Sequence, residues 1–335
     1  MDKLKGVVIF QTIVIITLAV LLSWFYAASL KPAERQKIIP GFLSERVYTG
    51  VLEPQSLLIN NFETLQSGIK SFLQGNNISA SVYVENLRNG ANMGINDELG
   101  YFPASLNKLP VAVLIMQEIE DGKLTLNSTL PIKEIDRSDK SGNLYLAAGN
   151  ELPVAVLLEK MIKESDNTAY NVLYDHIDEH KLARLLDYYN IKINVNYPQR
   201  RIEFINQTDS VTPASIYNFF SSLYLSTVLN PKDSEYLLSL LADTNFDIHK
   251  IADIPANVTI AQKYGAYYIK NSKFFHDCGI MYIQESKIFY CIMTKNLEVK
   301  PAEKVIGVTA NSIYNYVVDE RAKLDLYKKY IEEIP

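Results

Sequence analysis

Three short motifs in a fixed order constrain the fold of this chain more than any other feature. They are Ser105-Leu106-Asn107-Lys108, Ser165-Asp166-Asn167 and Lys263-Tyr264-Gly265. Each offers hydroxyl, amine or amide groups that can act on one substrate only if the fold brings the three segments together. The motifs therefore predict a single site, assembled from distant parts of the chain and suited to serine acyl transfer.

The first motif supplies a nucleophile and a base. Ser105 and Lys108 lie three residues apart, which on a helix places both on one face within a turn. A serine hydroxyl is a weak nucleophile until a base takes its proton. Lysine can do so when burial or a second cation lowers its pKa from about 10.4. Lys263 is suited to be that cation.

The spacing alone is weak evidence, because Ser67-Gly68-Ile69-Lys70 has it too, within an amphipathic stretch that we interpret as structural. Ser105 differs in its setting. Pro103-Ala104 precedes it, an apolar run from Leu109 to Met116 follows, and Asp121-Gly122 is a typical helix end. We expect Ser105 at a helix N-terminus, where developing negative charge is stabilised.

These motifs resemble those of the penicillin-recognising serine hydrolases, and most closely class A β-lactamases, whose signature is Ser-x-x-Lys, Ser-Asp-Asn and Lys-Thr-Gly. The resemblance covers about residues 56 to 335. Further matching segments are Tyr101-Phe102-Pro103-Ala104-Ser105, Leu109-Pro110-Val111-Ala112, Asp121-Gly122-Lys123-Leu124, Ser165-Asp166-Asn167-Thr168-Ala169 and Thr212-Pro213.

The resemblance implies an α+β fold: a five-stranded antiparallel sheet with flanking helices, plus an all-α domain inserted after the second strand. The active site would lie between the two. The expected organisation is a membrane anchor or signal peptide at 1–30, a linker at 31–55 and the hydrolase domain at 56–335. Its sheet lobe would comprise about 56–104 and 250–335, and its helical lobe about 105–249.

The resemblance also implies catalytic roles. Ser105 would attack the substrate carbonyl, Lys108 would take or relay its proton, and Ser165 would carry a proton toward the leaving nitrogen. Backbone N–H groups of Ser105 and Ala266 would form the oxyanion hole. Asp166 is expected to be a buried hydrogen-bonding residue.

The same resemblance implies the substrate contacts. Asn167 would bind the substrate amide or Lys108, and Lys263 would bind the substrate carboxylate and hold Ser165. Gly265 and Ala266 complete the binding strand. Tyr264 departs from the pattern, because the family has Thr or Ser there, whose hydroxyl contacts the β-lactam carboxylate. A phenol is bulkier and reaches differently.

The rate of deacylation distinguishes a β-lactamase, which must hydrolyse its acyl-enzyme quickly, from related cell-wall hydrolases. Class A enzymes hold the deacylating water within an Arg-x-Glu-x-x-x-Asn loop. The chain offers Arg201-Ile202-Glu203-Phe204-Ile205-Asn206, whose asparagine comes one residue early. We expect Glu203 to activate the water. The favoured function is β-lactam hydrolysis. The alternatives are a D-Ala-D-Ala carboxypeptidase or other cell-wall serine hydrolase, and a catalytically silent cell-wall-binding module.

The N-terminus predicts a membrane location. Gly6 to Leu30 carries no charge, and about 20 apolar residues suffice to cross a bilayer. Lys3 and Lys5 favour a cytoplasmic N-terminus, which would place the hydrolase domain outside the cytoplasm. We expect an uncleaved single-pass anchor in a bacterial cell membrane. The rival is a signal peptide cleaved near Tyr26-Ala27-Ala28, giving a secreted or periplasmic protein.

Composition excludes other partners. A net charge of −5, with 21% charged and 48% hydrophobic residues, is globular and gives no reason to expect nucleic acid. We expect a monomer without cofactor or metal, acting on a β-lactam or cell-wall peptide. His176-Ile177-Asp178-Glu179-His180 does fit a zinc-peptidase pattern, with both imidazoles on one helical face. We interpret it instead as a charged, solvated helix end.

Periodicity predicts the elements outside the motifs. Cys278 and Cys291 would face each other across a hairpin, where we expect two buried thiols, with a disulfide as the alternative. The remaining predictions are a helix over Leu57 to Leu73, a half-buried strand over Ile78 to Val84, a helix over Leu152 to Ile162, strands over Cys278 to Ile283 and Ile288 to Thr294, and a closing helix over Asn311 to Ile331.

Overall fold

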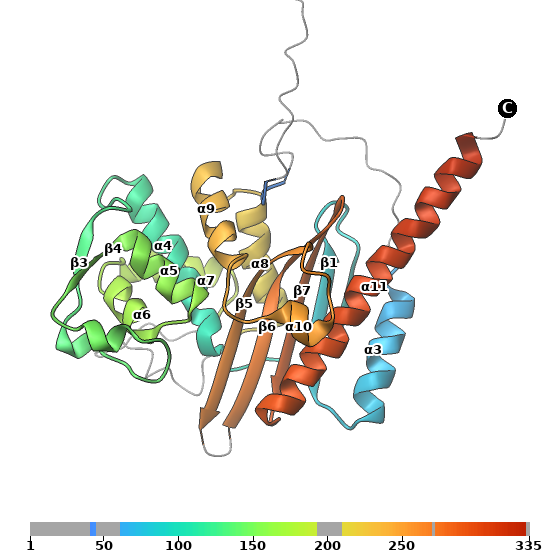
Figure 1. Ribbon diagram of the computed structural model, residues 1–335, viewed down its shortest axis with the longest axis horizontal. Coiled ribbons are helices and arrows are strands. Elements are labelled where there is room, and N and C mark those ends of the chain that lie inside the picture. The colour runs from blue at the N-terminus through green and yellow to red at the C-terminus, as the bar shows by residue number, and fades with distance from the viewer. Residues whose placement is uncertain (1–40, 45–60, 193–209, 270–271, 333–335) are drawn as a thin grey trace, which may run out of the picture. The chain divides into compact units, whose positions relative to one another are not determined.

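One antiparallel sheet organises the chain. The computed structural model describes residues 41–44, 61–192, 210–269 and 272–332, and Phe42–Pro335 form one compact unit. Among these residues, five strands form a sheet in the order β2-β1-β7-β6-β5, so the predicted five-stranded antiparallel sheet is confirmed (Figure 1). The strands are β1 Ala80–Asn86, β2 Asn92–Ile95, β5 Thr259–Ile269, β6 Ser272–Ile283 and β7 Ser286–Lys295.

The segment between β2 and β5 is mostly helical, as expected. It also holds a short hairpin of β3 Thr129–Pro131 and β4 Glu151–Pro153, so the prediction of an all-α insertion was wrong in this detail. The helices are α3 Glu63–Gly75, α4 Lys108–Glu120, α5 Val154–Lys163, α6 Asn167–Tyr174, α7 Glu179–Tyr188, α8 Pro213–Tyr224, α9 Pro231–Leu241, α10 Ile248–Ala252 and α11 Val299–Glu332. Single 3-10 turns are η1 Ala104–Asn107, η2 Glu134–Asp136 and η3 Leu144–Ala147.

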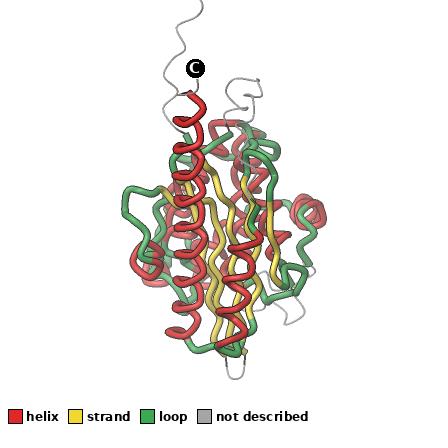
Figure 2. The backbone as a smooth tube through the Cα atoms, turned by 90° about the vertical axis from the view of Figure 1, so that its right-hand side faces the viewer, coloured by secondary structure: helices red, strands yellow, loops and turns green. Residues whose placement is uncertain are grey.

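The two faces of the sheet bury separate apolar layers. One face packs against α3 and α11, and Figure 2 shows α11, the helix leading to the marked C end, running along the strands. The opposite face packs against α8 and the helical lobe. Because β1 has helices on both faces, it is buried along most of its length. The prediction that this strand is half-buried was therefore wrong.

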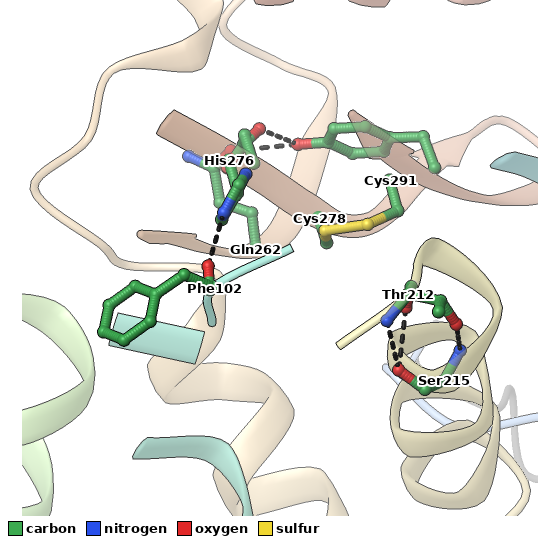
Figure 3. The surroundings of a disulfide bond; sticks show 9 residues. Phe102, Thr212, Ser215, Gln262, His276, Cys278 and Cys291 are labelled. Atoms are coloured by element: carbon green, nitrogen blue, oxygen red, sulfur yellow. Dashed lines mark hydrogen bonds between the residues drawn. A yellow bond between two sulfur atoms is a disulfide. The ribbon is translucent and has the colours of Figure 1, made fainter. Parts of the chain in front are cut away.

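Helix boundaries follow capping more closely than periodicity. Thr212 forms a capping box with Ser215, and Pro213 occupies the first turn of α8 (Figure 3). The closing helix begins at Val299, well before the predicted start at Asn311, because buried Ala302, Val305 and Ile306 extend its apolar face over the sheet.

The two cysteines form a disulfide, so the expectation of free thiols was wrong (Figure 3). Cys278 of β6 and Cys291 of β7 are directly opposed, with Cα atoms 4.0 Å apart. The sequence placed them opposite one another but gave no measure of this separation. Close opposition across an antiparallel pair brings both sulfurs onto the same face of the sheet.

The predicted membrane span, Gly6 to Leu30, falls outside the described residues. Among the helices of the described part, none is both long enough and apolar enough to cross a bilayer.

A glycine of α11 tests the packing of this helix, and a glycine of α3 serves as its control. A Cβ added at Gly307 would lie 2.1 Å from the Ile251 carbonyl oxygen of α10. Gly307→Ala should therefore lower the free energy of unfolding by about 1 to 3 kcal/mol, because α10 must move. Gly68→Ala in α3 meets nothing within 4 Å and should stabilise by about 0.5 to 1 kcal/mol. Chemical denaturation measures both, and equal effects would contradict the assigned helix contact.

Candidate active site

Ser105 lies in a strained turn held against the sheet. It is half-buried in η1, and α4 begins only at Lys108, so the predicted helix N-terminus is a single 3-10 turn. Ala104 has φ 48°, in the left-handed region that non-glycine residues rarely adopt. Such strain costs about 1 to 3 kcal/mol and persists where surrounding contacts enforce it.

Strands β5 and β6 supply those contacts. A Cβ added at Gly265 of β5 would lie 3.2 Å from both the Ser105 nitrogen and the Pro103 oxygen, so the strand passes directly against the turn. His276 of β6 contacts it through Nε2, which lies 2.9 Å from the Phe102 carbonyl oxygen (Figure 3). A carbonyl can only accept, so Nε2 donates. Burial lowers the pKa of His276 to about 4, which keeps the ring neutral.

The first two sequence motifs meet at the Lys108 amine, and the third joins them through Ser165. Lys108 Nζ lies 2.9 Å from Ser105 Oγ, 2.7 Å from Asn167 Oδ1 and 3.3 Å from Ser165 Oγ. Lys263 Nζ approaches the same Ser165 Oγ from β5, at 3.0 Å. The structure thus joins Ser105, Lys108, Ser165, Asn167 and Lys263 in one hydrogen-bonded chain.

The backbone conformation at Ser165 places its hydroxyl in this hydrogen-bonded series. Ser165 lies between α5 and α6 with φ 57°, and the next residue, Asp166, is the N-cap of α6. The Asp166 carboxylate accepts from the Ala169 nitrogen and the Leu144 nitrogen, both at 2.9 Å. It is fully buried, in agreement with the structural role expected of it.

Burial changes the protonation of both lysines. Lys108 and Lys263 have 0% exposure. Burial, reinforced by the nearby Lys263 cation and opposed by Asp166, holds the pKa of Lys108 well below its usual range. Burial lowers the pKa of Lys263 to about 7, and the attraction of Asp277 opposes that shift. Lys108 is therefore the amine that is neutral and available to accept a proton, and Lys263 retains more of its charge.

Tyr264 of β5 departs from the small hydroxyl residue that the family pattern has at this position. Tyr264 does not present a small hydroxyl: its ring stacks on Phe246, with centroids 5.1 Å apart and planes 29° apart. Lys263 Nζ lies 4.6 Å from the centroid of the Tyr264 ring. Ala266 is exposed, two residues beyond, on a strand that forms the edge of the described sheet.

Some predicted residues are not brought to this site. Glu203, with its neighbours Arg201 and Asn206, lies outside the described residues. His176 follows α6 in a turn, whereas His180 lies in the first turn of α7, which Asp178 caps. The two imidazoles therefore do not share one helical face, and the described residues hold no group of three metal donors.

Sequence reasoning missed two contributors. His276 holds the Ser105 turn, and its register opposite Gly265 became visible only with the strand pairing. Asp277 lies fully buried on β6, opposite Tyr264 of β5, and its Oδ2 accepts from the Tyr290 hydroxyl at 2.6 Å. Burial raises the pKa of Asp277 to about 7. The only sequence feature that could have indicated them is the pair of ionisable residues His276-Asp277 within an otherwise apolar strand.

Comparisons with known proteins agree with this arrangement. The profile of the β-lactamase enzyme family matches residues 64–317. β-Lactamase VEB-1 of Pseudomonas aeruginosa is 20% identical over 283 residues, covering 79% of this chain and 95% of the relative.

Solved structures share the fold. The TLA-1 extended-spectrum β-lactamase matches with a TM-score of 0.69 at 17% identity, covering 77% of this chain and 100% of that one. A variant of PBP-A, solved as an acyl-enzyme complex with penicillin G, matches with a TM-score of 0.67 at 21% identity, covering 76% and 97%. With the family profile spanning both lobes and all three motifs, this chain belongs to the β-lactamase enzyme family.

Proposed function

We propose that this protein is a serine hydrolase that forms an acyl-enzyme on Ser105 and hydrolyses β-lactams. The observation that carries the proposal is the position of Lys108 Nζ, within hydrogen-bond distance of Ser105, Ser165 and Asn167. A buried amine with a lowered pKa, next to a half-buried hydroxyl, is the arrangement that activates a serine at neutral pH.

Acylation follows from these contacts. The Ser105 oxygen forms a bond to the carbonyl carbon while its proton passes to Lys108 Nζ. The carbon–nitrogen bond then breaks, and the leaving nitrogen takes the proton of Ser165, which Lys108 replaces. Lys263 donates to the Ser165 oxygen and stabilises the negative charge that develops on it during the transfer.

The oxyanion would be held at the contact between η1 and β5. The close approach of Gly265 to the Ser105 nitrogen supports a pair of backbone donors there, from Ser105 and Ala266. If both donate, each is worth about 3 to 4 kcal/mol of transition-state stabilisation.

A second candidate function differs in the fate of the acyl-enzyme. In a D-Ala-D-Ala carboxypeptidase or other cell-wall serine hydrolase, a penicillin adduct would persist, because no base activates the deacylating water. Two observations favour keeping this candidate: the likeness to PBP-A, solved with penicillin G as an acyl-enzyme, and Tyr264 in the binding strand. Turnover by way of Glu203 would support the first function instead.

The nucleophile assignment has an internal control. Ser105→Ala should abolish covalent labelling by a fluorescent penicillin, because no other hydroxyl lies 2.9 Å from Lys108 Nζ in the described site. Ser67→Ala alters the second Ser-x-x-Lys copy, on an exposed face of α3, and should label like the unchanged protein. Intact mass spectrometry reads both, and persistent labelling of Ser105→Ala would sink the assignment.

The acylation rate should depend on the charge of Lys263. Its pKa of about 7 means that the ammonium is lost as pH rises through this value, so the rate of labelling should fall above about pH 7. Lys263→Arg keeps a cation at every pH in this range and should remove the fall, whatever its absolute rate. Stopped-flow labelling between about pH 6 and 9 tests this. Identical profile shapes would exclude Lys263 as the titrating group.

Glu203 decides between the two candidate functions. If it activates the deacylating water, Glu203→Gln should be acylated at an unchanged rate and then hold the adduct, because only the second step loses its base. Mass spectrometry over hours would show the unchanged protein free and the variant occupied. An unchanged protein that itself stays occupied would favour the second candidate, and equal turnover in both would remove Glu203 from the mechanism.

A further inference from the structure

Two consecutive side chains of β5 meet where strand geometry would separate them. Successive side chains of a strand point to opposite faces, so Lys263 and Tyr264 begin on opposite sides of the sheet. Yet Lys263 Nζ lies 4.6 Å from the centroid of the Tyr264 ring. β5 is an edge strand of the described sheet, so no described strand covers its outer side, and the Lys263 amine and the Tyr264 ring meet beside it.

The Tyr264 ring is supported from behind. It stacks on Phe246, which lies between α9 and α10, and Phe246 in turn contacts Phe275 of β6 at 5.6 Å between ring centroids. The Phe246 carbonyl accepts from Gln262 Nε2 at 2.7 Å, which fixes the segment to β5. Burial raises the pKa of the Tyr264 hydroxyl, so the ring is neutral at physiological pH. The ring is therefore a held, uncharged surface.

This ring changes what Lys263 can bind. The Lys263 ammonium has 0% exposure, and its hydrogen bonds within the described residues go to Ser165 Oγ and to the Tyr264 carbonyl oxygen, at 3.0 and 3.2 Å. An ammonium beside a nucleophile is where an anionic end of a substrate would bind. Here the face of an aromatic ring already lies against that cation, a favourable contact in its own right.

We propose that Tyr264 is a specificity-determining residue whose ring, stacked on Phe246, screens Lys263 from substrate carboxylates. The inference rests on the proposed acylation of Ser105 and names a specificity of that site: acylation does not require a carboxylate at the Lys263 end of the acyl donor. Lys263 then serves Ser165 alone, and penicillins are acylating agents that gain little from their negative charge.

A pair of matched acyl donors tests this on the full chain. Benzylpenicillin and its methyl ester differ at the carboxylate, and acylation of Ser105 by each is measured by stopped-flow competition and intact mass. In the unchanged protein the two rate constants should be similar. Tyr264→Thr uncovers the ammonium and should raise the acid-to-ester ratio by about tenfold or more, the value of one charge-assisted hydrogen bond.

Two further variants separate the ring from other effects. Tyr264→Phe keeps the ring without its hydroxyl and should keep the ratio of the unchanged protein. Phe246→Ala removes the support of the ring and should raise the ratio, which preserves the test if Tyr264→Thr does not fold.

The outcomes are distinguishable. An equal ratio in the folded Tyr264→Thr and Tyr264→Phe proteins would overturn the screen while leaving the acyl-enzyme intact. A strong preference for the acid in the unchanged protein would do the same. Absence of both an adduct on Ser105 and any consumption of either compound, in every variant, would overturn the proposed function, and this inference with it.

Discussion

The site depends on two lysine amines buried within reach of one hydroxyl. Lys108 and Lys263 are fully buried, and each lies within hydrogen-bond distance of Ser165 Oγ. Charging both would add mutual repulsion to the cost of removing each cation from water. The lower free energy belongs to an arrangement with one neutral amine and one cation. Ser105 and Asn167 are the other hydrogen-bond partners of the neutral Lys108 amine, whereas the charge of Asp277 stabilises the Lys263 cation. Burial therefore separates the two amines into one neutral base and one cation.

Backbone geometry makes that burial possible. The Ser105 turn is pressed against β5 at Gly265, where a side chain would have no room, and tied to β6 through His276. Ala104 and Ser165 both adopt left-handed conformations, and the Ser105 and Ser165 hydroxyls of these two segments both lie within hydrogen-bond distance of Lys108 Nζ. The apolar layers on the two faces of the sheet hold these strained turns, because neither could relax without moving a strand.

The motifs predicted the site more fully than periodicity predicted the elements. Ser105, Lys108, Ser165, Asn167 and Lys263 were expected together because their chemistry requires contact, and the structure joins them. Strand β1 was predicted to be half-buried because its apolar residues alternate with Ser and Tyr. The sequence of the strand does not show that helices cover its second face as well. The start of α11 was missed although Ala302, Val305 and Ile306 recur at helical spacing, so the signal for its first turns was present in the sequence. The direction of the Tyr264 ring depends on Phe246, which no local pattern connects to β5.

The disulfide carries a consequence for the order of assembly. Cys278 is in register with Lys263, and Cys291 with Tyr83, so the bond lies in the same row of the sheet as Lys263, facing the helical lobe. Both sulfurs are wholly enclosed in the finished protein. An oxidant must therefore reach them while the hairpin is still open to solvent, before α8 covers that face. Once the helical lobe covers this face, the same enclosure keeps soluble thiols from reducing the bond. Whether the two cysteines are bonded is therefore set while the chain folds.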